Sequence, residues 1–271
     1  MTAGEAWTRE LLADLRASGF RPTGWRSFLS RSFARSAEMR ALRRREHRQL
    51  VLLATLGTAA WAAVAAGGQP WLALAGAAWL VLLLLLVDWH LGMLEDETGR
   101  RLAGLGIPNL LGIGRGALVP ALLATPAPLV LTLLLAAGAS DVLDGPLARA
   151  RGQESRLGRF LDGGVDACVL GAVAVAAARL GLLPWWSAGL VLGRHLAQWS
   201  ALALAYFLGV QTARESIVNS RTAGLVIFGG LVLALIHVPL AGEVVAAGAL
   251  AAIAALVLTI ARTLRLEVAP A

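Results

Sequence analysis

The chain has 271 residues, of which 58% are hydrophobic and 15% charged, and its formal net charge at pH 7 is +7. This composition excludes an ordinary water-soluble domain, in which about 25% of residues are charged. A membrane-spanning helix needs about 20 largely apolar residues. Because the sequence contains several such runs, we predict an all-α polytopic membrane helix bundle.

Residues 1–49 precede the first apolar run and hold most of the positive charge. They contain 11 Arg and 5 acidic residues. Apolar residues recur among these charges at helical spacing, first at Trp7, Leu11 and Leu15. This pattern predicts helices that lie on a membrane surface, where the arginines face anionic lipid headgroups rather than nucleic acid.

Eight apolar runs follow, each ended by Gly, Pro or a charged residue. We predict spans at residues 50–67, 70–88, 108–126, 128–148, 157–183, 185–209, 222–238 and 243–262. The positive-inside rule then places the N-terminus in the cytoplasm, and eight spans return the C-terminus to the same side of the cell membrane. The loops predicted to be cytoplasmic carry further arginines, and only Arg179 lies near an opposite end.

The predicted organisation has five parts. Residues 1–49 form a cytoplasmic basic amphipathic segment, residues 50–88 two extra transmembrane helices, and residues 89–107 a charged cytoplasmic connector. A six-helix core follows over residues 108–262, and residues 263–271 form a cytoplasmic tail.

Four carboxylates fall at the cytoplasmic ends of two consecutive predicted spans. Asp141 and Asp144 are three residues apart, and Asp162 and Asp166 are four apart, so each pair shares one helical face. A charge at membrane depth costs about 2.5–3.5 kcal/mol on insertion scales, so we expect a cation to compensate these groups. Oxygen ligands without His or Cys suit a hard divalent ion such as Mg²⁺ or Mn²⁺.

The turn between these two helices favours a phosphate ligand. Gly145 and Gly158 flank the turn, and the lack of a Cβ allows a nucleotide or a facing backbone to come close. Arg149 lies just over one turn beyond Asp144 and could pair with a diphosphate. Together these residues predict a metal and diphosphate site at the cytoplasmic surface.

This stretch resembles the signature of the CDP-alcohol phosphatidyltransferase family, which reads D-x2-D-G-x2-A-R-x8-G-x3-D-x3-D. All eight defined positions match at the right spacing. They are Asp141, Asp144, Gly145, Ala148, Arg149, Gly158, Asp162 and Asp166.

The resemblance extends over about residues 108–262. The start of this region is similar to the family pattern P-N-x2-T-x2-R-x4-P, with Pro108, Asn109, Arg115 and Pro120 in place. Gly112 stands where Thr is usual, which bears on donor affinity or donor identity. Residues 1–88 lie outside the resemblance.

The resemblance implies a role for each signature residue. Asp141, Asp144 and Asp162 would bind a pair of Mg²⁺ or Mn²⁺ ions, with Asp166 as a fourth ligand or as the general base. The residues expected to bind the CDP-linked donor are Asn109, Arg115, Gly145, Ala148, Arg149, Ser155 and Gly158. For Arg115, a helix–helix hydrogen bond or snorkelling toward the surface is an equally good reading.

The reaction that the resemblance implies is a phosphatidyl transfer. The hydroxyl of a polar alcohol attacks the phosphorus next to the lipid-bearing oxygen of a donor such as CDP-diacylglycerol, and CMP leaves. Glycerol phosphate, inositol phosphate, serine or another lipid alcohol could be the acceptor. Family analogy also implies a homodimer.

A site for the acceptor is expected around two arginines. Arg194 lies inside the sixth predicted span, where an unpaired guanidinium is costly, and Arg221 opens the seventh. If they converge, they suit a phosphorylated acceptor. His195 stands where the family has Glu, and Arg194 could instead be structural, bonded to a neighbouring span.

Three other readings remain open. The aspartates could form a structural ion-pair cluster with nearby arginines at positions 149, 151, 156 and 159. The chain could be a transporter or a metal-ion carrier, although such proteins place their charges near the membrane midplane. It could also be a catalytically silent scaffold, although a decayed enzyme would be expected to lose metal ligands.

Overall fold

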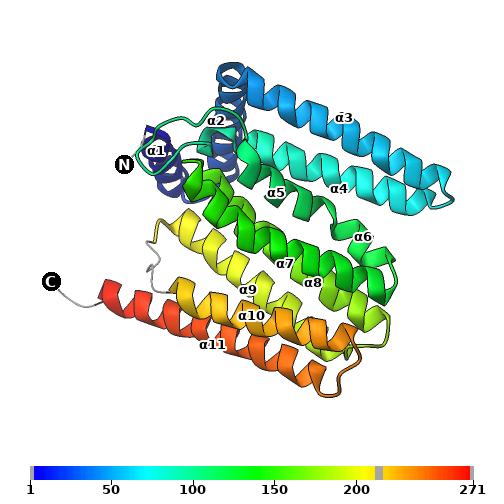
Figure 1. Cartoon of the computed structure of the whole chain (residues 1–271). Coiled ribbons are helices and arrows are strands. Elements are labelled where there is room, and N and C mark those ends of the chain that lie inside the picture. The colour runs from blue at the N-terminus through cyan, green and yellow to red at the C-terminus, as the bar shows by residue number, and fades with distance from the viewer. Residues whose placement is uncertain (1–2, 211–215, 269–271) are drawn as a thin grey trace. The chain divides into compact units, whose positions relative to one another are not determined.

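The computed structural model describes the backbone of residues 3–210 and 216–268, and within these ranges it contains helices and no strand. The all-α prediction is therefore confirmed (Figure 1). The α-helices are α1 (Ala3–Ala17), α2 (Pro22–Leu42), α3 (Arg44–Ala66), α4 (Pro70–Trp89), α5 (Gly106–Ala117), α6 (Val119–Ala124), α7 (Ala127–Ala150), α8 (Arg156–Arg179), α9 (Trp185–Leu208), α10 (Ser216–Leu235) and α11 (Ala241–Val268).

Six helical stretches of the described chain are long and apolar enough to cross a membrane. They are α3, α4, the single stretch formed by α5 and α6, then α7, α8 and residues 241–263 of α11. The chain is thus a multi-pass membrane protein. The other two predicted spans are also helical, but α9 is not among the six and the apolar part of α10, Thr222–Leu235, is shorter.

The first predicted span begins earlier than expected. The apolar run starts near residue 50, but α3 begins at Arg44, so three exposed arginines lie on the same helix as the span. Arg and Gln are good helix formers, and no Gly or Pro separates the charged residues from the apolar ones. The helix therefore extends through the boundary that hydropathy indicates.

The third predicted span is broken, and Pro120 explains the break. It has no backbone N–H to donate to the carbonyl of Gly116, so the α-helical ladder is interrupted there. The chain forms α5 and α6 with Leu118 between them. The Gly116 carbonyl instead accepts a hydrogen bond from Nε1 of Trp79 on α4, at 2.7 Å.

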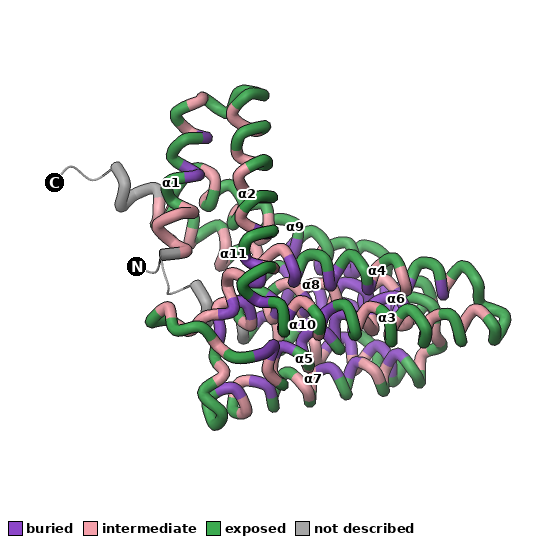
Figure 2. Tube along the Cα trace, turned by 90° about the horizontal axis from the view of Figure 1, so that it is seen from above, coloured by how far each residue is buried: buried purple, intermediate pink, exposed green. Residues whose placement is uncertain are grey.

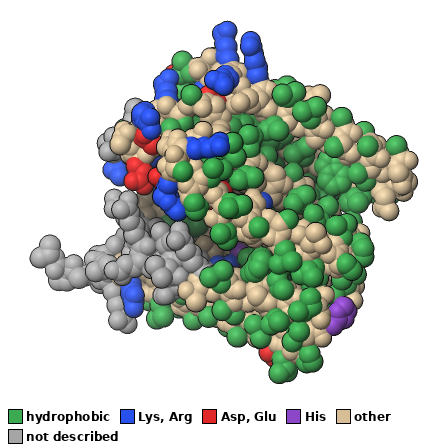
Figure 3. Space-filling model, viewed as in Figure 1, with side chains coloured by type: hydrophobic (Ala, Val, Ile, Leu, Met, Phe, Trp, Pro, Cys, Tyr) green, Lys and Arg blue, Asp and Glu red, His purple; other side chains and the backbone are tan. Residues whose placement is uncertain are grey.

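The helices α1 and α2 form a pair whose outer faces are exposed (Figure 2). The periodicity of residues 7–15 predicts a helix, and α1 is one, but Leu11 and Leu15 are buried within the protein, so the position of this face on a membrane surface stays a prediction. Arg31 on α2 forms ion pairs with Glu10 and Asp14 on α1. Residues 3–42 therefore contain two helices, of which α1 buries one apolar face, and basic side chains gather over them and the start of α3 (Figure 3).

The connector between α4 and α5 is held by the start of α3. The buried Arg43 donates to the carbonyls of Leu94 and Leu102 at 2.7 and 3.0 Å. Glu46 and Gln49 accept from the backbone N–H groups that precede α5, those of residues 104 and 105. The N-terminal helices thus fix the chain that leads into α5.

By their internal contacts the residues divide into two compact units. Unit 1 comprises residues 1–124 and 135–169, and unit 2 comprises residues 125–134 and 170–271. One apolar cluster of unit 1 joins α3, α4, the connector, α5 and α8 through Leu50, Leu80, Leu83, Leu84, Val87, Leu91, Leu94, Leu105, Ile113, Leu157 and Leu161. In unit 2, α11 packs against both α9 and α10.

Candidate active site

The four predicted aspartates all lie in unit 1 and converge on one residue, Arg115 of α5. Its guanidinium is 2.8 Å from Asp144 Oδ2, 3.2 Å from Asp162 Oδ1 and 3.4 Å from Asp166 Oδ1. It also forms an ion pair and a hydrogen bond with Asp141. The helical spacing therefore does what it predicts: each helix presents two carboxylates to the same point.

The cluster is closed on one side and open on the other. The side chain of Arg115 is 3% exposed and that of Asp144 is 9% exposed. The other three aspartates are 42–47% exposed. Arg115 and Asp144 therefore form the floor of the site, and the remaining carboxylates can meet a ligand that enters from the open side.

One guanidinium does not balance four carboxylates. With every group ionised, the cluster keeps a formal charge of −3, because four negative charges face one positive charge. The arginines of the neighbouring turn do not supply the difference. Arg156 pairs with Glu5 and Glu95, and Arg159 pairs with Glu97. The cluster is thus suited to a further cation.

The donor set fits a hard divalent ion in its chemistry, because it consists of carboxylate oxygens only. Within the described residues, however, no three His, Cys, Asp or Glu side chains are already grouped as a metal site. The guanidinium of Arg115 lies among the carboxylates instead. Arg115 Nε is buried and has no hydrogen-bond partner in the described chain.

Three of the predicted donor-binding residues form the junction of α5 with α8. Ser155 is the residue before α8, and its hydroxyl accepts from the backbone N–H of Gly158 at 2.9 Å, as a helix N-cap does. The side chains of Asn109 and Ser155 also lie 3.4 Å apart. A Cβ on Gly158 would be 2.9 Å from Asn109 Oδ1, so a larger residue there would displace the Asn109 side chain.

The other predicted donor residues lie along α7. A Cβ on Gly145 would be 3.5 Å from Arg149 Nη1, so the exposed Arg149 folds back over the glycine. Ala148 is buried. Gly112, which replaces the usual Thr, lies on α5, and a Cβ there would be 3.8 Å from Asp162 Oδ1. The substitution therefore leaves space directly beside the aspartate cluster.

The two predicted acceptor residues have different outcomes. Arg194 is buried in α9 of unit 2, and its Nη1 is 3.2 Å from the ring nitrogens of His195. Arg221 lies outside the residues whose side chains the structure describes. The convergence of Arg194 with Arg221 stays a prediction.

Sequence reasoning missed two features of this site. It assigned Arg115 to donor binding or to a structural bond, and it did not predict that Arg115 contacts all four aspartates. It also gave residues 1–88 no part in the site, although Trp79 bonds to the residue after Arg115. The signal for the second feature was Pro120, which leaves the carbonyl four residues earlier without its helical partner.

The fold and the site define a class: a multi-pass α-helical membrane protein with an acidic cluster at the ends of two spans. The model of the CDP-alcohol phosphatidyltransferase family matches residues 105–261, which is more than half of the chain. The chain belongs to this family. The resemblance seen in its sequence is thereby confirmed.

Several curated proteins are similar to part of the chain. A Mycobacterium tuberculosis protein named as a cardiolipin synthase is 34% identical over 111 residues, which is 39% of this chain and 53% of the relative. A Drosophila melanogaster protein named as a CMP-forming cardiolipin synthase is 37% identical over 95 residues, 33% of this chain and 30% of the relative.

A chloroplastic rice protein is named CDP-diacylglycerol–glycerol-3-phosphate 3-phosphatidyltransferase 1. It is 40% identical over 107 residues, or 38% of this chain and 32% of the relative. The chain therefore spans about half the length of the mycobacterial relative and about a third of the other two. No solved structure matches the chain significantly.

Proposed function

We propose that the protein transfers a phosphatidyl group from a CDP-linked lipid donor, CDP-diacylglycerol, to the hydroxyl of a polar alcohol and releases CMP in phospholipid synthesis. One observation carries this proposal: all four aspartates of the family signature converge at one point with their charge only partly compensated. A catalytically silent scaffold has no need to keep an excess of carboxylates that costs stability.

The charge excess supports metal dependence. Asp141, Asp144, Asp162 and Asp166 would hold Mg²⁺ or Mn²⁺, two ions by family analogy. When bound, such ions neutralise a diphosphate and stabilise the entering and leaving oxygens of the transfer. Arg115 compensates the same carboxylates from the closed side of the site and holds them together.

The open side of the cluster is where the reacting groups would meet. Asp166 accepts the proton of the acceptor hydroxyl as general base. The hydroxyl oxygen forms a bond to the phosphorus next to the lipid-bearing oxygen, and the bond from that phosphorus to CMP breaks. Arg149, which lies exposed over Gly145, pairs with the donor diphosphate.

The acceptor is the less defined substrate. The names of the relatives favour glycerol phosphate or a lipid alcohol over inositol phosphate and serine. Arg194 and Arg221 remain the proposed acceptor residues. We further propose that the protein is a homodimer of the cell membrane with its site and both termini on the cytoplasmic side, as its arginines and its family favour.

The direct test is a CMP-release assay on the purified full chain in detergent. It uses CDP-diacylglycerol, Mg²⁺ or Mn²⁺ and a panel of acceptor alcohols. Asp166→Asn should lower the rate by about 10²–10⁴-fold, because it removes the general base. Glu154→Gln is the matched control, since it removes an exposed carboxylate of the turn before α8 that lies outside the cluster.

Each outcome bears on a different reading. Metal-dependent release with one acceptor, lost in Asp166→Asn and kept in Glu154→Gln, supports the transferase and names its substrate. No release with any acceptor contradicts the proposal and favours the silent scaffold. Metal uptake into sealed vesicles without CMP release favours the ion carrier.

A further inference from the structure

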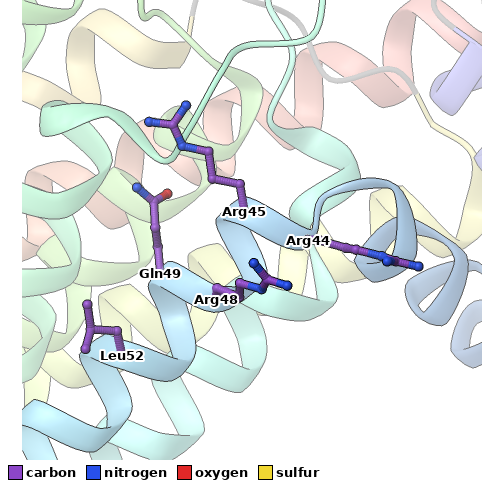
Figure 4. Close-up of a pocket in the computed structure, with 5 residues that line it drawn as sticks. All are labelled: Arg44, Arg45, Arg48, Gln49 and Leu52. Carbon is purple, nitrogen blue, oxygen red and sulfur yellow. The ribbon is translucent and has the colours of Figure 1, made fainter.

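A second charged site lies at the start of α3, within unit 1. The exposed arginines Arg44, Arg45 and Arg48 line a shallow pocket of about 520 Å³ together with Gln49 and Leu52 (Figure 4). The five residues come from three successive turns of one helix. The guanidinium groups of Arg44 and Arg45 extend from the helix in different directions, and the side chain of Arg48 is drawn between them.

These three arginines have no carboxylate partner in the part of the chain that the structure describes. Other arginines of the segment do have partners: Arg31 pairs with Glu10, and Arg35 pairs with Glu38. The acidic residue in the first turn of α3 is Glu46, and its Oε1 accepts from the N–H of Gly104 at 2.8 Å. The local carboxylate is thus turned away from the pocket.

The location makes this positive charge unfavourable without an anion. The N-terminal end of a helix carries partial positive charge, so cations are destabilising in its first turn. Arg44 and Arg45 open the 23-residue helix α3, and Arg48 follows one turn later. Three like charges also repel one another. An anion from outside the chain would remove both penalties.

The surroundings of the pocket indicate that this anion is a lipid headgroup. Arg44 is the first residue of a candidate membrane span, and Leu52 lies about 12 Å further along the helix axis. No residue of α3 within positions 51–66 is buried, and although Leu53, Ala54 and Trp61 pack against the apolar cluster of unit 1, the opposite face presents Val51, Leu52 and Leu56 outward. The pocket therefore stands at the level where a polar surface meets an apolar one.

A second shallow groove continues along α3. It is lined by small residues and has a volume of about 420 Å³, and the residues are Ala54, Thr55, Thr58, Ala59 and Ala62. Small side chains leave room for an extended hydrocarbon chain against the helix. A ligand with an anionic head and a long apolar tail fits this arrangement, with its head at the arginines and its tail along the groove that ends at Ala62.

We propose that the start of α3 binds the phosphate-bearing headgroup of an anionic phospholipid, with an acyl chain along the groove. Arginine suits this role because its planar guanidinium can donate two parallel hydrogen bonds to one phosphate. The site belongs to the N-terminal helices, outside the residues that match the family model. It does not depend on the transferase proposal.

The test titrates phosphatidylglycerol into the full chain in detergent and counts bound lipids by native mass spectrometry. An arginine at an anionic lipid surface contributes about fivefold in affinity. R44Q/R45Q/R48Q should therefore weaken the binding of phosphatidylglycerol to this pocket by on the order of 100-fold. The matched control is R9Q/R21Q/R26Q, which removes three exposed arginines from α1, the α1–α2 turn and α2. It should change affinity less than about twofold.

Three results would overturn the proposal. Equal loss in both triple variants would show diffuse attraction to the basic surface. Displacement of the lipid by inorganic phosphate would show a site for soluble anions. Unchanged lipid binding with loss of a dimer in R44Q/R45Q/R48Q would show that this face contacts a second copy. If that variant does not remain monodisperse, the three single variants carry the test, each with an expected loss of about fivefold.

Discussion

Two charged clusters lie in the same compact unit. One consists of the aspartates of α7 and α8, and the other consists of the arginines at the start of α3. The aspartates gather on Arg115, which is 3% exposed, so that part of their charge is balanced within the bundle. Arg44, Arg45 and Arg48 remain exposed beside a carboxylate that bonds elsewhere. Charge that lies between helices requires an internal partner, whereas charge at a surface can be balanced by a ligand from outside.

The largest expected effect comes from the floor of the acidic cluster. Asp144→Asn removes a buried carboxylate that faces Arg115, and it should lower CMP release by on the order of 10³-fold, because the charge that organises the site is lost. Asp88→Asn is the control, since Asp88 is equally buried at 7% exposure but pairs with His47. If both variants lose activity equally in the folded fraction, burial of an aspartate matters and the cluster does not.

The next effect tests whether Arg115 and a metal compensate the same charge. Arg115→Gln leaves four carboxylates without their cation, and it should lower the free energy of unfolding by about 3 kcal/mol in EDTA. Mg²⁺ should recover part of this loss, measured as the shift in thermal midpoint. Arg179→Gln, which removes an exposed hydrogen bond to the carbonyl of Thr125, should show no such Mg²⁺ dependence. If Arg115→Gln is destabilised relative to the wild type by the same amount with and without Mg²⁺, Arg115 and the metal do not compensate the same charge.

A smaller effect tests how the N-terminal helices hold the site. Trp79→Phe removes the N–H that bonds to the Gly116 carbonyl, and it should cost about 1–3 kcal/mol because that carbonyl then lacks its partner. The measurement is thermal unfolding in detergent, followed by CMP release at a temperature where the variant is folded. Trp71→Phe is the control, since Trp71 is 82% exposed. An equal shift in both variants would mean that general loss of tryptophan area is responsible.

The smallest expected effect concerns the connector between α4 and α5. Hydrogen bonds from Thr98 and Arg100 hold the pKa of Asp96 well below its usual range. A depressed carboxylate pKa contributes stability above its unfolded value of about 4, and this stability is lost as the pH falls further.

Hydrogen exchange of residues 94–102 should therefore speed up on acidification in the wild type, after correction for intrinsic rates. Asp96→Asn should remove this additional pH dependence. Glu97→Gln, one residue along, should keep it. Equal pH dependence in the wild type and in Asp96→Asn would show that another group controls the connector.

Much of the architecture follows from local sequence. Apolar runs predicted a helix at each of the six stretches that are long and apolar enough to span a membrane, and the spacing of Trp7, Leu11 and Leu15 predicted the helix α1. The helix boundaries were less predictable. Hydropathy indicated a start near residue 50, but helix propensity carries α3 back to Arg44. Pro120 was in view as a match to the family pattern, and its effect on the helix ladder was missed.

The sequence by itself determined that the chain is an all-α membrane protein of the CDP-alcohol phosphatidyltransferase family and that two pairs of aspartates lie on two helical faces. The helical class follows from composition and the paired aspartates from spacing along one helix, which do not depend on distant residues, and the family follows from the resemblance of residues 141–166 to its signature. Only the tertiary structure decided that Arg115 meets all four aspartates, that Trp79 completes the broken helix beside it, and that Glu46 turns away from its neighbouring arginines. Such pairings depend on which helical faces pack together, and that choice is made by the burial of side chains from across unit 1.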